Sequence, residues 1–165
     1  MKNESYSHPP RHDGYAGLGD YAAIGDGRSV ALIAPDGAID WWCAPNMDSP
    51  PLFDRILDAS SGGYFQIEPI SDYRVDRRYR ENSNVLETFY ETASGCVRLT
   101  ESLNSNYAGR LPWCELAGRV EGIKGEVELR VIFVPGTAAC TRSPWIQNTN
   151  KGQVIHIGDL MAMLR

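Results

Sequence analysis

The residues best suited to chemistry are Asp40, Trp41 and Trp42, which are consecutive, and Asp48, which follows in a Pro-rich stretch. A carboxylate accepts hydrogen bonds from hydroxyl groups, and an indole face packs against the apolar C–H face of a sugar ring. Successive side chains of a strand point to opposite faces. One tryptophan can therefore fill a core while the other meets solvent, another domain or a ligand. These four residues are the candidate substrate-binding or interdomain residues.

Plainer structural roles also fit the same four residues. Both tryptophans can be packing residues, and Asp40 can cap a neighbouring turn. Asp48 precedes Ser49 and Pro50, an arrangement typical of a turn in which an aspartate bonds to nearby backbone. From the residues alone we favour packing for the tryptophans and a turn role for Asp48, with ligand contact as the alternative.

Other residues that could carry catalysis or bind a metal are less promising. Paired carboxylates can hydrolyse glycosidic bonds, but Glu87 with Glu91, and Glu126 with Glu128, have the even spacing of a solvated strand face. The three histidines are far apart in the sequence, and the four cysteines lack the C-x-x-C spacing of a zinc site. The sequence therefore predicts no catalytic residue, no metal site and no cofactor.

The composition is that of a globular domain, with 165 residues, 42% hydrophobic content and a net charge of -5. An acidic chain of this kind is a poor match for nucleic acid, which usually requires a basic face. We find no secretory signal and no apolar run long enough to cross a membrane. We therefore expect a cytoplasmic protein with reduced thiols and neither a nucleic-acid nor a membrane partner.

Alternating apolar residues and turn signals predict an antiparallel β-sandwich. The expected hairpins are 29–33 with 38–43, 85–92 with 96–103, and 115–120 with 126–134. Ser49-Pro50-Pro51 is typical of a helix start, so one short helix is expected over 52–58. A strand is expected over 154–157, and the apolar run 158–165 stops without a polar tail, which predicts truncation at the C-terminus.

The residues also suggest a division of the chain. Residues 1–17 are polar and rich in Pro, Gly and His, so we expect a flexible N-terminal arm. Residues 18–165 are then the β-sandwich domain, which is incomplete if the C-terminus is truncated.

Several motifs together resemble a known enzyme family. The stretch LGDYAAIGDGRSVALIAPDGAIDWWCAPNMDSPPLFDRIL over residues 18–57, followed by GGYFQIEP and later segments, is similar to the N-terminal domain of glycoside hydrolase family 15, in its bacterial glucoamylase and trehalase-like branch. In two places the sequence departs from that pattern: Asn46-Met47 stands where Arg-Phe is common, and 136–142 where an Arg-Phe-Asp-Tyr-Gly run is common.

The resemblance implies a supersandwich-type β domain that packs, in full-length members, against a helical (α/α)₆ barrel. The barrel of such enzymes hydrolyses α-glucosidic bonds, including those of trehalose, and carries both catalytic glutamates. This chain has no counterpart of the barrel, so the resemblance implies a non-catalytic module that supports the barrel and its cleft rim and is inactive alone. The alternatives are a stand-alone carbohydrate-binding domain, with an α-glucoside or trehalose ligand, and a domain that self-assembles through exposed strand edges.

Overall fold

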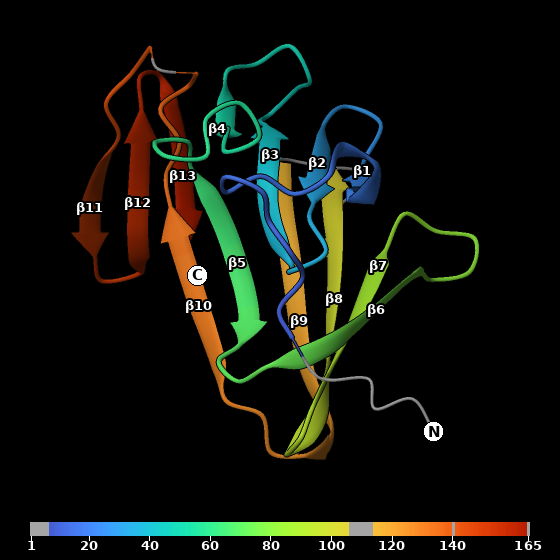
Figure 1. The fold of residues 1–165 in the computed structure, drawn as a ribbon. Helices are drawn as coiled ribbons and strands as arrows, with labels where there is room; N and C mark the ends of the chain where they lie inside the picture. The colour runs from blue at the N-terminus through green and yellow to red at the C-terminus, as the bar shows by residue number, and fades with distance from the viewer. Residues whose placement is uncertain (1–6, 106–113, 140, 165) are drawn as a thin grey trace.

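The structure is a computed structural model that describes residues 7–105, 114–139 and 141–164. The described residues form three antiparallel sheets and one short 3₁₀ helix, η1 (Leu18–Asp20). Figure 1 shows the strands arranged as layers, with the three-stranded sheet at one side. The expected all-β antiparallel sandwich is confirmed.

Each sheet is built mainly from strands that are close in the sequence. The six-stranded sheet has the order β1 (Ala22–Gly25), β2 (Val30–Ile33), β3 (Ala38–Cys43), β5 (Tyr64–Pro69) and β10 (Leu129–Val134), with β4 (Pro51–Phe53) paired to β3. The four-stranded sheet contains β6 (Tyr73–Tyr79), β7 (Leu86–Thr92), β8 (Gly95–Ser105) and β9 (Cys114–Gly125). The three-stranded sheet contains β11 (Trp145–Thr149), β12 (Gly152–Ile157) and β13 (Leu160–Leu164).

The main hydrophobic core joins all three sheets. Alternation along each strand turns one face inward, and the inward residues include Ile24, Ile33, Trp42 and Phe53 of the first sheet, Leu86 and Leu103 of the second, and Ile155 and Ile157 of the third. A second hydrophobic cluster, around Tyr73 and Tyr90, packs against Ile67 of β5 and Leu129 of β10. Burial of this apolar surface is the main force that stabilises the layers.

Two of the predicted hairpins are confirmed. In the first, the turn between β2 and β3 closes with a 2.9 Å hydrogen bond from the Gly37 N–H to the Ala34 carbonyl. Gly37 has a φ of 80°, which L-residues with a side chain rarely adopt. A Cβ at this position would also lie 2.0 Å from Tyr90 Oη, so both the backbone conformation and the lack of space require glycine. In the second, β7 and β8 pair around Ala93 and Ser94. The predicted strand over 154–157 also lies within β12.

The predicted third hairpin is wrong. Strand β9 continues to Gly125 because it pairs with β8 along almost its whole length, from Ser105↔Cys114 to Gly95↔Gly125. After Gly125 the chain changes sheets, and β10 pairs with β5 instead. The predicted hairpin requires a turn between residues 120 and 126, but pairing with the long strand β8 continues through this segment to Gly125.

The predicted helix over 52–58 is also wrong. Pro51–Phe53 form strand β4, with Phe53 opposite Trp42 of β3, and only turns follow. The Phe53 ring lies 6.0 Å from the Trp42 ring and 5.8 Å from the Phe133 ring, centroid to centroid. Strand pairing and this aromatic packing outweigh the local helix signal of the Ser-Pro-Pro start.

Residues 7–16, called the arm below, lie against the domain, as the dark blue segment crossing β3 shows (Figure 1). The Ser7 N–H donates to the Tyr73 carbonyl at 3.2 Å, and the His8 ring meets the Tyr73 ring edge-on at 4.9 Å. Tyr15 Oη accepts the Ala59 N–H at 3.1 Å. These contacts restrain the arm in the structure, and its mobility in solution stays a prediction.

Candidate functional site

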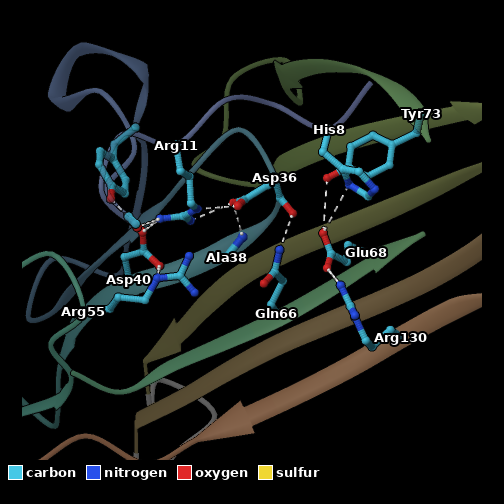
Figure 2. Close-up of polar contacts among 12 residues, drawn as sticks. His8, Arg11, Asp36, Ala38, Asp40, Arg55, Gln66, Glu68, Tyr73 and Arg130 are labelled. Carbon is cyan, nitrogen blue, oxygen red and sulfur yellow. Dashed lines mark hydrogen bonds and ion pairs between the residues drawn. The ribbon is translucent and has the colours of Figure 1, made fainter. Parts of the chain in front are cut away.

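Asp40, the first predicted site residue, is fully buried on β3 and is surrounded by donors (Figure 2). Its Oδ2 atom accepts hydrogen bonds from Tyr21 Oη at 2.6 Å and from Arg11 Nη1 at 2.9 Å. Its Oδ1 atom lies 3.3 Å from Arg55 Nε in an ion pair. Burial and the hydrogen bond to Asp40 both raise the pKa of the Tyr21 hydroxyl, which therefore remains a donor.

Asp36, in the turn between β2 and β3, completes the cluster. Its two carboxylate oxygens accept Arg11 Nε at 2.6 Å and Arg11 Nη2 at 2.9 Å. Burial would lower the pKa of Arg11, but the hydrogen bonds to Asp36 and Asp40 outweigh it, so the pKa lies above its ordinary value. We call Arg11, Tyr21, Asp36, Asp40 and Arg55 the Asp40 cluster.

The Asp40 cluster balances its charges inside the fold. Two arginines face two aspartates, and the Arg55 guanidinium also lies 4.0 Å from the centroid of the Tyr64 ring. A buried ion pair is seldom more stabilising than apolar packing of the same volume, but removal of one partner leaves an unpaired buried charge. The cluster therefore joins the arm, β3 and the segment after β4 in one arrangement.

A second polar group lies beside the Asp40 cluster (Figure 2). Glu68 of β5 accepts a hydrogen bond from Arg130 Nη2, and its Oε2 lies 3.9 Å from His8 Nδ1. Burial, followed by the charge of Glu68, raises the pKa of the Tyr73 hydroxyl, which donates to Glu68 at 3.4 Å. Gln66 connects the two groups by donating to the Asp36 carbonyl at 3.1 Å.

The two predicted tryptophans lie in different environments. Trp42 is 7% exposed, and its Nε1 donates to Ser29 Oγ at 3.0 Å. Ser29 Oγ in turn donates to the Cys43 carbonyl. Trp41 is half-buried on the opposite face of β3, as strand alternation requires. The geometry gives Trp42 a packing role, and its contact with substrate or another domain stays a prediction.

Asp48 is exposed in the loop 44–50, which follows β3 and begins at the buried residue Ala44. This loop rests on the β1–β2 turn, because Arg28 Nη2 donates to Asn46 Oδ1 at 3.1 Å and the Met47 N–H donates to the Arg28 carbonyl at 2.9 Å. Met47 is 62% exposed beside Asp48. The structure therefore separates a buried Asp40 from an exposed Asp48 instead of gathering the four predicted residues.

The members of the two carboxylate pairs lie in different environments, and Glu87 is buried instead of lying on the expected solvated face. Glu87 faces the guanidinium groups of Arg78 and Arg80, which are the main cause of its lowered pKa. Its partner Glu91 is exposed, as are both members of the second pair. In the part of the chain that the structure describes, no three His, Cys, Asp or Glu side chains come together as metal ligands, and no helix is long and apolar enough to cross a membrane.

The sequence did not single out the four residues that complete the cluster, and it also did not single out Asp54. These four are Arg11, Tyr21, Asp36 and Arg55. Asp54 is buried and accepts backbone N–H groups from Gly63 at 2.7 Å and Ala139 at 2.8 Å. These partners are separated by 9 and 85 residues, so no short motif could reveal them. The available sequence signal was that isolated aspartates, among them Asp36 and Asp54, stand next to apolar residues.

Glu101 of β8 is a further buried acid that the sequence did not single out. It is 3% exposed, lines an open cavity of about 650 Å³ with Phe65 and Leu116, and its Oε2 has no hydrogen-bond partner among the described residues. Burial raises the pKa of its carboxyl to about 8, and the charge of Arg77 opposes this only in part. Glu101 is therefore protonated at neutral pH.

The comparisons with known proteins identify the family. Residues 16–156 match the family described as trehalase-like, N-terminal, and the chain belongs to it. The chain is 35% identical over 126 residues to a trehalase of Thermoplasma volcanium and 36% identical over 124 residues to a trehalase of Thermoplasma acidophilum, covering 74% and 73% of this chain. A trehalase of Mycobacterium tuberculosis is 35% identical over 101 residues, or 59% of this chain.

The chain spans only a small part of these relatives. The matched region is 20% of the Thermoplasma volcanium trehalase, 21% of the Thermoplasma acidophilum trehalase and 14% of the Mycobacterium tuberculosis trehalase. No solved structure matches the chain significantly. The match therefore establishes the family of this domain. It does not assign the activity of the whole relatives to this chain, because most of each relative lies outside the matched region.

The Asp40 cluster yields a stability prediction. We expect Asp40→Asn to lower the free energy of unfolding by about 3 kcal/mol, because it removes the carboxylate paired with the buried Arg55 guanidinium group and one of the two carboxylates paired with Arg11. Asp48→Asn, the matched change at an exposed position, should alter it by less than about 0.5 kcal/mol. Urea unfolding followed by circular dichroism measures both. Equal effects of the two substitutions would contradict the structural role of Asp40.

Glu101 yields a pH prediction. The folded state keeps this proton up to a pKa of about 8, whereas an unperturbed carboxyl loses it near 4.5. Folding therefore binds a proton between these pH values, and Glu101 makes stability fall as pH rises through this window. Glu101→Gln should become more stable than the wild type by a margin that grows by a few kcal/mol from pH 5 to pH 8. Glu91→Gln, at an exposed position, should show no such trend, and a constant margin for Glu101→Gln would refute the assignment.

Proposed function

We propose that this chain is the non-catalytic N-terminal module of a trehalase- or glucoamylase-like glycoside hydrolase of the family 15 type. Its role is to support a separate helical catalytic domain and to shape the rim of that domain's cleft. The observation that carries the proposal is the exposed loop 44–50, which stands on a buried, hydrogen-bonded base at the end of β3.

The geometry of this loop favours a positioning role. Ser29, Trp42 and Cys43 at its base are all buried, and the neighbouring turn supports it through Arg28. Loops held on a rigid scaffold commonly carry binding residues. Asp48 and Met47 are then the groups offered to the catalytic domain, and Asp48 can accept hydrogen bonds from substrate hydroxyls.

Catalysis is assigned to the other domain for a chemical reason. Hydrolysis with inversion needs two carboxyl groups that face each other across the scissile bond, with about 6.5–9.5 Å between them. Here Asp36 and Asp40 are paired with arginines, and Asp54 is saturated by backbone N–H groups. Glu101 has no second carboxyl group among the described residues that line its cavity. We therefore propose that this module alone is inactive.

The proposal extends to domain boundaries and location. Residues 18–165 are taken as one β domain, and the family match over 16–156 supports this boundary. Residues 1–17, which include the arm, are taken as an N-terminal extension of that domain. A cytoplasmic location is proposed because Cys43, Cys96 and Cys114 are free thiols, and secreted domains of this size commonly contain disulfides.

A second candidate function is carbohydrate binding by the module alone. Trp145 of β11 is 56% exposed, and one face of its ring stacks on His156 at 3.8 Å between centroids with an interplanar angle of 2°. An exposed indole of this kind is a platform on which a sugar ring can pack. A saturable change in tryptophan fluorescence with trehalose or maltose, lost in Trp145→Ala, would favour this candidate over the first.

The main proposal is tested by transplantation. The isolated chain should not hydrolyse trehalose or maltose. A chimera in which it replaces the matching region of the Thermoplasma volcanium trehalase should hydrolyse trehalose, whereas that enzyme without any such region should lose activity or fold poorly.

The chimera also tests the loop. Asp48→Ala should lower kcat/KM for trehalose by about tenfold or more, because small displacements at a cleft are costly. Glu126→Ala, which removes another exposed carboxylate, should leave it unchanged. Hydrolysis by the isolated chain, or identical kinetics for the two variants, would overturn the proposal.

A further inference from the structure

The two carboxylates that bind Arg11 are fixed by contacts that do not involve the arm. Asp36 Oδ1 accepts the Ala38 N–H at 3.2 Å, and the Asp36 carbonyl accepts Gln66 Nε2 at 3.1 Å. Asp40 lies within β3 and is bound by Tyr21 and Arg55. The pair of carboxylates is therefore organised by the β2–β3 hairpin and its neighbours, before any group from the arm is added.

The donors that fill this place have the geometry of a guanidinium group. Arg11 uses all three of its nitrogens: Nε and Nη2 contact the two oxygens of Asp36, and Nη1 contacts Asp40 Oδ2. Such a planar, side-on fit is specific to guanidinium, since an ammonium group is a compact point charge without the fork. The site thus distinguishes arginine from lysine.

The charge balance gives the site its affinity. Arg55 neutralises one of the two carboxylates, and Arg11 neutralises the other, while the Arg11 side chain is only 15% exposed. Without Arg11, the Asp36 carboxylate, whose side chain is 10% exposed in the folded chain, would lose this ion-pair partner, which is unfavourable for a mostly buried charge. A small planar cation that takes the place of the Arg11 guanidinium group would remove that penalty.

We propose that Asp36 and Asp40 form a preformed guanidinium-binding site, and that the N-terminal arm is its tethered ligand. The arm has other contacts with the domain, namely Ser7 and His8 with Tyr73, His8 with Glu68 and Asp72, Tyr15 with Ala59, and the buried Ala16 in the core. Arg11 makes the shortest polar contacts between the arm and the domain, at 2.6–2.9 Å, so loss of its guanidinium group should loosen the arm.

The test is chemical rescue of Arg11→Ala in the full chain, with guanidinium chloride as the probe at up to about 50 mM and ionic strength held constant with NaCl. Free guanidinium should raise the Tm of Arg11→Ala in a saturable manner by about 2–4 °C. The wild type and Arg119→Ala, which removes an exposed arginine outside both the arm and loop 44–50, should show no rise. Methylammonium chloride should not rescue Arg11→Ala, and the double variant Arg11→Ala, Asp36→Asn should not respond to guanidinium.

A second variant keeps the test decisive if Arg11→Ala does not fold. Arg11→Lys retains the positive charge but cannot make the side-on hydrogen bonds of the planar guanidinium group to both carboxylates. The arm should therefore detach from the domain more often. The amide protons of His12 and Tyr15, which bond to each other's carbonyls at 2.9 Å, should exchange about tenfold faster than in the wild type, while amides of β7 stay unchanged. Absence of rescue in a folded Arg11→Ala, or unchanged exchange in Arg11→Lys, would overturn the proposal.

Discussion

The buried carboxylate of Asp40 is the constraint on which much of this structure depends. A charge on a central strand, removed from water, must be met by donors, and here they come from three separate segments: Arg11 in the arm, Tyr21 before β1 and Arg55 after β4. Each of these segments is irregular, and each also has other contacts with the domain. The shared carboxylate adds a buried charged contact that joins all three to β3.

Asp54 is a second buried carboxylate that connects separate segments, but its donors are backbone N–H groups instead of arginine side chains. Its carboxylate accepts N–H groups from both the 54–63 segment and the 136–139 segment. Buried acids thus connect loops to the sheets at two points, while apolar packing around Trp42 and Phe53 stabilises the layers. Between them, these interactions leave loop 44–50 as an exposed segment on a fixed base, which is what a module beside a catalytic domain would require.

Short-range patterns predicted the local elements well. Pro35-Asp36-Gly37 indicated the first hairpin because the turn dihedrals are set by those residues themselves, and the opposite facing of Trp41 and Trp42 followed from strand geometry. The helix over 52–58 and the hairpin after β9 failed because their outcome depends on distant partners, namely β3 for Phe53 and β8 for the 122–125 segment.

The candidate site was predicted only in part, for the same reason. Asp40 was singled out by its neighbours in the sequence, but Arg11 lies 29 residues before it and carries no motif. The sequence could suggest that Asp40 has a polar task. It could not show that Asp40 contacts two arginines, because those contacts depend on how the chain returns to β3.

The most direct test of the account is a double-mutant cycle on Arg11→Ala and Asp40→Asn, with the free energy of unfolding measured for the wild type, both single variants and the double variant. If the buried cluster organises the fold, the two residues should show a favourable coupling of about 1–3 kcal/mol. Losses that simply add, to within about 0.5 kcal/mol, would show that the arm and β3 are stabilised independently and would contradict the account.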